Sequence, residues 1–149
     1  MRYLTFALIM TVVFVAGGCT MPLSERNEQA EKQFALHPIG KVARDNGKTL
    51  IVLDKKYEAG LSGLEKHAHV TVVYWFDKND TPEKRAILKV HPRGRKENPL
   101  TGVFATHSPV RPNLIAISRC KIISVEENVI EIEEIDAFDD SPVLDLKSG

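Results

Sequence analysis

Two polar segments hold most of the side chains in this sequence that could bind a small ligand. Residues 106–113 read THSPVRPN, and residues 136–142 read DAFDDSP. Proline restricts the residue before it to extended backbone, and an asparagine amide both donates and accepts hydrogen bonds. The first segment could therefore fix the polar edge of a ligand, while the oxygens of the second could accept hydrogen bonds. The same residue types also make ordinary turns, and spacing alone favours that simpler interpretation.

The two segments flank a predicted hairpin, which brings them to the same place. Residues 114–125 and 129–135 are rich in β-branched side chains and are separated by Glu-Glu-Asn. A hairpin returns the chain to its starting end, so both polar segments should emerge at one edge. A cleft between them would set Arg111 against Asp136, Asp139 and Asp140. This excess of negative charge would suit a cationic ligand, and Arg111 would hold any carboxylate that the ligand carries.

The elements that must position these segments are short strands. Residues 45–48 read DNGK, and Asn-Gly supplies the two positive φ angles of a type I′ hairpin turn. Residues 70–76 are all β-branched or aromatic, which predicts a central, buried strand with Trp75 in the core. Residues 61–66 predict one helical turn, and residues 92–102 a loop. The predicted strands are residues 37–44, 49–53, 68–76, 85–91, 114–125 and 129–135. The predicted fold class is all-β, a small antiparallel β-barrel with one short helical turn.

Size and charge limit the functions that the chain can have. Its 149 residues suit one domain, and 43% hydrophobic content is enough for a core. A formal net charge of zero gives no general attraction to nucleic acid, so RNA binding would need a local basic patch. Basic residues gather between positions 84 and 96, where they could meet phosphates or simply guard a solvated strand edge. These residues are Lys84, Arg85, Lys89, Arg93, Arg95 and Lys96.

The first 18 residues predict a targeting signal and not part of the fold. One arginine precedes an apolar run, which ends in Gly17, Gly18 and Cys19. Small residues before a cysteine are typical of bacterial lipoprotein signals, and the run is short for a bilayer-spanning helix, the alternative interpretation. We therefore expect a signal peptide over residues 1–18, lipidation of Cys19, a polar tether over residues 19–33 and the domain over residues 34–149. This arrangement places the protein at the cell envelope, attached to the membrane through the lipid.

Other reactive arrangements are weak in this sequence. His67 and His69 could face one way on a strand as half of a metal site, but no further ligand follows at a fixed spacing. No Ser-His-Asp or Cys-His spacing indicates a nucleophile, and no phosphate-binding loop is present. The sequence therefore predicts no metal site and identifies no catalytic residue.

Four segments, in order and over about 110 residues, resemble the TsaA-like (TrmO-type) family of S-adenosylmethionine-dependent tRNA methyltransferases. Residues 37–42, HPIGKV, match the family's opening PIGxV, and residues 61–76 match its LxGL segment and following strand. Residues 102–118, GVFATHSPVRPNLIAIS, resemble GVFATRSPxRPNPIGLS, the most specific of the four patterns. Residues 136–147, DAFDDSPVLDLK, resemble the family's DGTPVLDIK ending.

The resemblance implies a barrel that dimerises and binds S-adenosylmethionine beside the dimer interface. It also implies methylation of N6-threonylcarbamoyladenosine beside the tRNA anticodon. If the chain is such an enzyme, a base such as Asp136 or Asp139 could take the proton. With the resemblance, the two polar segments become cofactor-binding loops instead of plain turns. The implied cofactor-binding residues are Thr106, Ser108, Arg111, Asn113, Asp136, Asp139, Ser141 and Pro142.

This sequence departs from the family pattern at several site positions. Residues 45–48 form a bare turn where many members carry a long Pro-Arg-Gln loop, and His107 stands where the family has arginine, a permanent forked cation. Asp140 replaces a glycine. Two functions follow: a cytoplasmic methyltransferase acting on tRNA, or an exported, non-catalytic module that binds a small ligand or partner. Calorimetry with S-adenosylmethionine distinguishes them, and Arg111→Ala and Asp139→Ala should both weaken ligand binding.

Overall fold

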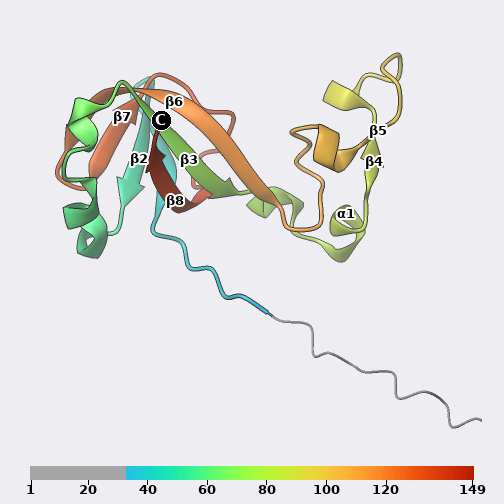
Figure 1. Ribbon diagram of the computed structural model, residues 1–149, viewed down its shortest axis with the longest axis horizontal. Helices are drawn as coiled ribbons and strands as arrows, with labels where there is room; N and C mark the ends of the chain where they lie inside the picture. The colour runs from blue at the N-terminus through green and yellow to red at the C-terminus, as the bar shows by residue number, and fades with distance from the viewer. Residues whose placement is uncertain (1–32) are drawn as a thin grey trace, which may run out of the picture. The chain divides into compact units, whose positions relative to one another are not determined.

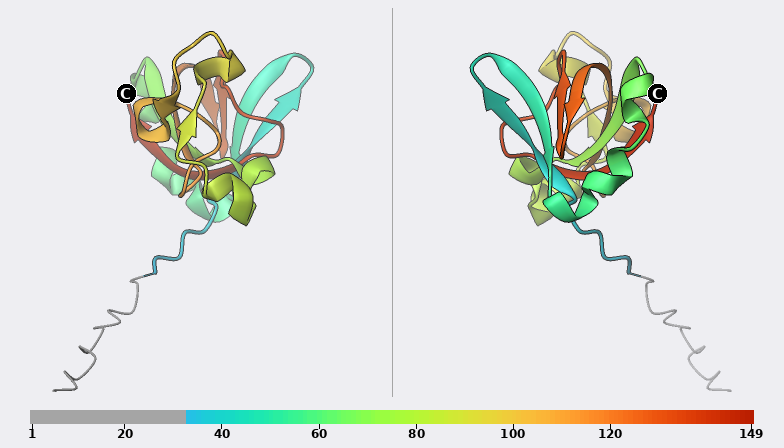
Figure 2. Two further views of the ribbon diagram at one scale, coloured as in Figure 1. Left: turned by 90° about the vertical axis from the view of Figure 1, so that its right-hand side faces the viewer. Right: turned by 90° about the vertical axis from the view of Figure 1, so that its left-hand side faces the viewer.

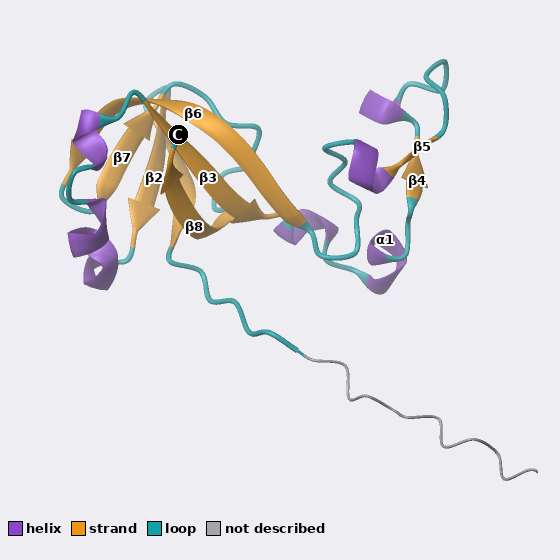
Figure 3. Ribbon diagram, viewed as in Figure 1, coloured by secondary structure: helices purple, strands orange, loops and turns teal. Residues whose placement is uncertain are grey.

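Six antiparallel strands close into a barrel. The computed structural model describes residues 33–149; the predicted signal peptide, Cys19 and the tether to residue 32 lie outside them. The barrel order is β1-β2-β7-β6-β3-β8, and β1 pairs with β8 to close it (Figure 1). Strands dominate and helical turns are few, as Figure 3 shows. The predicted all-β barrel is confirmed. Its strands are β1 (Gly40–Asp45), β2 (Lys48–Leu53), β3 (His69–Trp75), β6 (Ile115–Glu126), β7 (Val129–Ile132) and β8 (Pro142–Ser148).

Alternation along the strands fills the barrel interior. In β2, Thr49, Ile51 and Leu53 are buried, while the residues between them are partly exposed. Successive side chains of a strand point to opposite faces, so one face of each strand supplies the core. Asn46 and Gly47 turn β1 into β2 with φ angles of 47° and 78°, and this confirms the predicted hairpin (cyan in Figure 2).

The strand β3 is central, as expected, because it pairs with β6 on one side and β8 on the other. Only its alternate residues Val70, Val72 and Tyr74 are buried. Trp75 is partly exposed, so the prediction that it lies in the core is wrong. A single-layer barrel has one apolar interior, and the second face of an apolar strand must find cover elsewhere.

Two 3₁₀ turns, η1 (Lys55–Leu61) and η2 (Leu64–Lys66), connect β2 to β3 where the sequence predicts one helical turn. Gly63 separates them with a φ of 89°, a conformation that favours glycine. No helix among residues 33–149 is both long enough and apolar enough to cross a lipid bilayer.

A long connecting segment, residues 76–114, leaves the barrel at the end of β3 and returns at the start of β6. The backbone N–H of Phe76 donates to the carbonyl oxygen of Leu114 at 2.9 Å, which joins the two ends of the segment. Within it, β4 (Lys89–Val90) and β5 (Thr101–Gly102) form a separate two-stranded sheet (Figure 1). Its helical turns are η3 (Asp77–Asn79), α1 (Pro82–Arg85), η4 (Pro92–Gly94) and η5 (Val103–Ala105).

The predicted strand over residues 85–91 is wrong for most of its length. Thr81 caps a helix instead, because its hydroxyl accepts a hydrogen bond from the N–H of Lys84 at 3.3 Å. Pro82 occupies the first turn of α1, where its missing N–H costs nothing. Local capping therefore overrides the alternating pattern, and only Lys89 and Val90 remain as strand.

Candidate functional site

The candidate site is a hollow between the barrel and the connecting segment, with a volume of about 520 Å³. The end of β3 supplies Tyr74, and the start of β6 supplies Ser118. The connecting segment contributes residues 104–107 and Arg111, and Asp136 enters after β7. A second hollow of about 460 Å³ lies beside Leu64 and His67, which precede β3, and contains none of the predicted site residues.

Tyr74 links the barrel interior to the acidic side of the hollow. Its hydroxyl donates a short hydrogen bond to the backbone carbonyl of Asp136 and lies 3.3 Å from the hydroxyl oxygen of Ser118. Burial raises the pKa of Tyr74; the Ser118 hydrogen bond opposes the rise and the nearby Asp136 charge adds to it. The phenol therefore stays protonated at neutral pH and fixes the backbone at Asp136.

Hydroxyl side chains shape the loop that carries Arg111. The hydroxyl of Thr106 donates to the carbonyl of Val103 at 3.0 Å and accepts from the N–H of Ser108 at 3.2 Å. The hydroxyl of Ser108 accepts from the N–H of Val110 at 3.3 Å. Of the first predicted segment, Thr106, His107 and Arg111 line the hollow. Ser108 shapes the loop instead, and Asn113 is exposed outside the hollow.

The second predicted segment joins the hollow only at Asp136. The Oδ1 of Asp139 accepts from the backbone N–H of Arg44 at 2.9 Å, and Asp140 forms a 2.7 Å ion pair with Lys41. Ser141 is buried, and its carbonyl accepts from the N–H of Val42, while Pro142 pairs with Lys41 in the closing ladder. Residues 139–142 therefore run along β1, and of the three carboxylates expected in the cleft only Asp136 lines the same hollow as Arg111.

The family described as tRNA-methyltransferase O N-terminal domain matches residues 30–148. The chain belongs to this family.

Proteins similar in sequence to this chain include archaeal and mammalian ones. The chain is 46% identical over 114 residues to a probable S-adenosyl-L-methionine-binding protein of Methanocaldococcus jannaschii, covering 76% of this chain and 90% of that one. It is 41% identical over 90 residues to a human tRNA (adenine(37)-N6)-methyltransferase, covering 60% of this chain but 20% of the human protein.

Solved structures show the same fold. TrmO of Pseudomonas aeruginosa superposes with a TM-score of 0.60 at 22% identity, covering 79% of this chain and 56% of that chain. A second TrmO structure gives a TM-score of 0.60 at 26% identity, with 79% and 58% covered. The chain thus spans little more than half the length of these TrmO chains.

Sequence patterns missed several residues of the hollow. Tyr74 and Ser118 read as ordinary strand residues, and only the β3–β6 register, in which Tyr74 pairs with Ala116, brings them together. Phe104 lines the hollow with 78% of its surface exposed. It lies inside the third family motif, so the motif could have pointed to it. Among the described residues, no group of three or more His, Cys, Asp or Glu side chains is placed to hold a metal ion.

Proposed function

We infer that this chain binds S-adenosylmethionine in the hollow and acts as a methyltransferase on tRNA adenine. The observation that carries this inference is the family match over residues 30–148 together with the hollow. Two relatives are named as probable S-adenosyl-L-methionine-binding proteins, and the match to this chain spans 90% of the length of one and 81% of the other. The volume of about 520 Å³ lies in the range of small-molecule sites.

The side chains of the hollow fit the charges of such a cofactor. S-adenosylmethionine has a carboxylate, an ammonium group and a sulfonium, and Arg111 and Asp136 offer one charge of each sign. We assign the carboxylate to Arg111 and the cationic part to Asp136. The exposed ring of Phe104 offers a surface on which adenine can stack.

When bound, the cofactor supplies an electrophilic methyl group. The chain's task is positioning, which accounts for a large share of the rate of such transfers. Asp136 is the base candidate within the hollow and would take the proton released from the methylated nitrogen. Asp139, the other candidate from the sequence, is held by the Arg44 backbone outside the hollow.

Isothermal calorimetry with S-adenosylmethionine tests this proposal. Arg111→Ala and Asp136→Ala should each weaken binding by about tenfold to a hundredfold, because each removes a charge-assisted hydrogen bond. Arg119→Ala is the matched control, since Arg119 is an exposed arginine of β6 outside the hollow. Absence of binding to the wild-type chain near millimolar cofactor would refute the proposal.

The substrate part of the proposal is tRNA, as the names of the mammalian relatives indicate. Lys89, Arg93, Arg95 and Lys96 are exposed on the connecting segment, which also forms one wall of the hollow. Basic side chains near a reaction site can bind the phosphate backbone, and their contribution falls with salt. Binding to tRNA should therefore weaken steeply with salt, and less steeply for Lys96→Ala.

We also propose a homodimer, supported by apolar side chains exposed at the hollow. Phe104 and Ile117 line it with exposed fractions of 78% and 58%, and Leu88, 58% exposed, hydrogen-bonds through its carbonyl to the N–H of Val103. Scattered exposed apolar residues are common, but neighbouring ones indicate an interface. Analytical ultracentrifugation should give twice the monomer mass, and Phe104→Asp should restore the monomer.

The N-terminal sequence supports a second candidate, an envelope module that binds a small ligand without methylating tRNA. The apolar run before Gly17, Gly18 and Cys19 is typical of lipid-anchored export. An exported domain would be separated from cytoplasmic tRNA. Whether Cys19 carries lipid therefore discriminates between the two locations, the cell envelope and the cytoplasm.

A further inference from the structure

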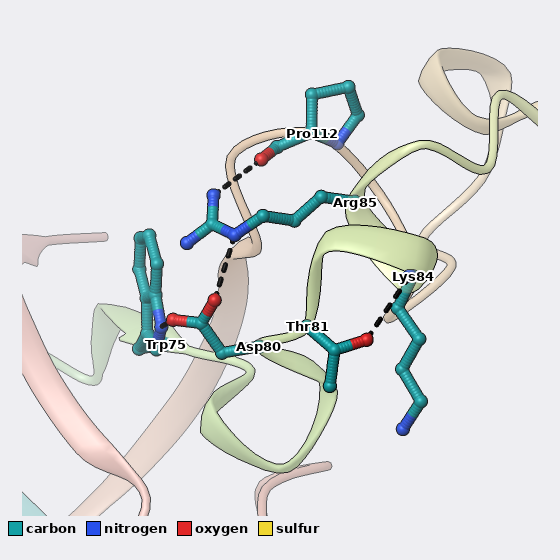
Figure 4. Close-up of polar contacts among 6 residues, drawn as sticks. All are labelled: Trp75, Asp80, Thr81, Lys84, Arg85 and Pro112. Carbon is teal, nitrogen blue, oxygen red and sulfur yellow. Dashed lines mark hydrogen bonds and ion pairs between the residues drawn. The ribbon is translucent and has the colours of Figure 1, made fainter.

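The Arg85 side chain joins the end of β3, the first turns of the connecting segment and the loop near its other end. Its Nε donates to Asp80 Oδ1 at 2.8 Å, and its Nη1 donates to the carbonyl oxygen of Pro112 at 2.7 Å (Figure 4). Its guanidinium carbon also lies 5.3 Å from the centre of the Trp75 ring. Trp75 completes the network by donating from Nε1 to Asp80 Oδ2 at 3.1 Å.

Local structure explains why Arg85 reaches this position. Tyr74 points into the barrel, so Trp75, the next residue and the last of β3, lies on the outer face. The short helix α1, capped by Thr81, ends at Arg85. The ring, the carboxylate and the guanidinium therefore form a fixed block at the end of β3, where the connecting segment leaves the barrel.

The contact with Pro112 transmits this fixed position to the hollow. The pyrrolidine ring locks φ of Pro112, and a residue before proline is confined to extended backbone. Few torsions remain free between the Pro112 carbonyl and the Cα of Arg111. Holding that carbonyl therefore also restricts Arg111, which lines the same hollow as Asp136.

We propose that Arg85 is a positioning residue that orients Arg111 toward the carboxylate of the bound ligand. This inference rests on the proposed function. An arginine is required because its planar fork can bond the Asp80 carboxylate and the Pro112 carbonyl together while stacking on a ring. A lysine ammonium keeps the charge but offers no such fork.

The ionic part of the network is present at neutral pH. The hydrogen bond from Arg85, followed by that from Trp75, lowers the pKa of Asp80 below its usual value. The Arg85 and Asp80 side chains are 35% and 42% exposed, so solvent screens the pair and its effect on folding is small. Arg85 should therefore matter more for ligand affinity than for stability.

The test compares Arg85→Lys with the wild-type chain by calorimetry with S-adenosylmethionine and by thermal unfolding. We expect about tenfold weaker binding with an unchanged melting midpoint. Lys84→Ala is the matched control, because Lys84 lies on the same helix. Within residues 33–149, its Nζ donates a hydrogen bond only to the carbonyl of Lys78. The affinity of this variant should equal that of the wild type.

A double-mutant cycle shows whether Arg85 acts through Arg111. Arg85→Lys should cause no further loss of affinity in an Arg111→Ala background, since the residue that it positions is then absent. An equal loss in both backgrounds, or no loss in either, would overturn the proposal. A lower melting midpoint of Arg85→Lys with unchanged affinity would assign Arg85 a structural role alone, and this outcome would also overturn the proposal.

Two further measurements do not depend on ligand binding, so they separate this inference from the proposed function. Trp75 is the single tryptophan, and its emission should change in Arg85→Lys but not in Lys84→Ala. Exchange of the backbone amide hydrogens of residues 103–110 should be faster in Arg85→Lys than in the wild-type chain. If the wild-type chain binds no S-adenosylmethionine, the proposed function fails, and unchanged exchange in Arg85→Lys would then reject the positioning role as well.

Discussion

At the residue scale, the glycine of the opening HPIG segment is explained by a close approach of two strands. A Cβ added at Gly40 would lie 2.3 Å from the carbonyl oxygen of Val52 and 2.7 Å from the Cα of Leu53. Both are backbone atoms of β2, which pairs with β1 at this point. Neither can move aside without disturbing the ladder, so the residue type is set by packing and not by ligand chemistry.

We therefore expect Gly40→Ala to lower the free energy of unfolding by about 1–3 kcal/mol, the usual cost of overpacking. Denaturant unfolding followed by circular dichroism measures the change. Gly60→Ala is the matched control, because a Cβ there meets nothing within 4 Å. Equal stability of the Gly40→Ala and wild-type chains would show that the strands separate easily.

Cys120 gives a second prediction at this scale. Burial raises the pKa of its thiol to about 11 from 9.0. At pH 8 about one thiol in a thousand is then ionised, and only the thiolate reacts rapidly. In a Cys19→Ser background, a disulfide reagent should label Cys120 slowly in buffer and rapidly in denaturant. Rapid labelling of the folded chain would contradict the burial of Cys120.

The same shift makes stability depend on pH. Because the pKa of the Cys120 thiol is raised in the folded chain, its contribution to stability is present below pH 9 and is lost as pH rises toward 11.

At the element scale, the segment between β7 and β8 is held by β1. The Arg44 side chain donates to the carbonyls of Ile135 and Ala137 at 3.1 Å and 3.0 Å, and its backbone N–H donates to Asp139. The carbonyl of Val42 accepts from the N–H of Asp140. These contacts direct the chain into β8, so this segment serves barrel closure after leaving the hollow at Asp136.

Asp139→Ala should consequently reduce stability by up to about 1 kcal/mol, the net value of one hydrogen bond, and leave S-adenosylmethionine affinity unchanged. Asp139→Asn keeps an acceptor oxygen, so its stability and its S-adenosylmethionine affinity should both be close to those of the wild type. Thermal unfolding and calorimetry measure the two quantities. A loss of affinity without a loss of stability would return Asp139 to the ligand site, as the family resemblance implies.

At the scale of the whole molecule, the barrel and the connecting segment have different tasks. The barrel supplies Tyr74, Ser118 and Asp136 from a hydrogen-bonded frame, and the connecting segment supplies Phe104, Thr106 and Arg111. Residues 1–32 lie outside this description.

For those residues we expect cleavage before Cys19 and lipid on its sulfur, leaving 149 − 18 = 131 residues. Mass spectrometry of the N-terminal peptide from fractionated cells measures this directly. Cys19→Ala should stay unprocessed and provides the control. An unmodified Met1 in the cytosolic fraction would instead locate the chain where tRNA is available.

The sequence by itself determined the elements whose signals are local. Runs rich in β-branched residues marked β2 and β3, and Asn46-Gly47 fixed the first hairpin because the turn needs two positive φ angles. The β6–β7 hairpin was also predictable, and with it the presence of Arg111 and Asp136 in one hollow. These features depend on backbone torsions and side-chain types within a few residues.

Only the tertiary structure decided which members of the two polar segments share a site. Asp139, Ser141 and Pro142 left the hollow because closing the barrel pairs Lys41 with Pro142, about 100 positions apart in the chain. The β3–β6 register brought Tyr74 beside Ser118, and the alternation of side chains along β3 turned Trp75 outward to meet Arg85. Such choices follow from burying one face of every strand and satisfying backbone hydrogen bonds around a closed sheet, which no short window of sequence contains.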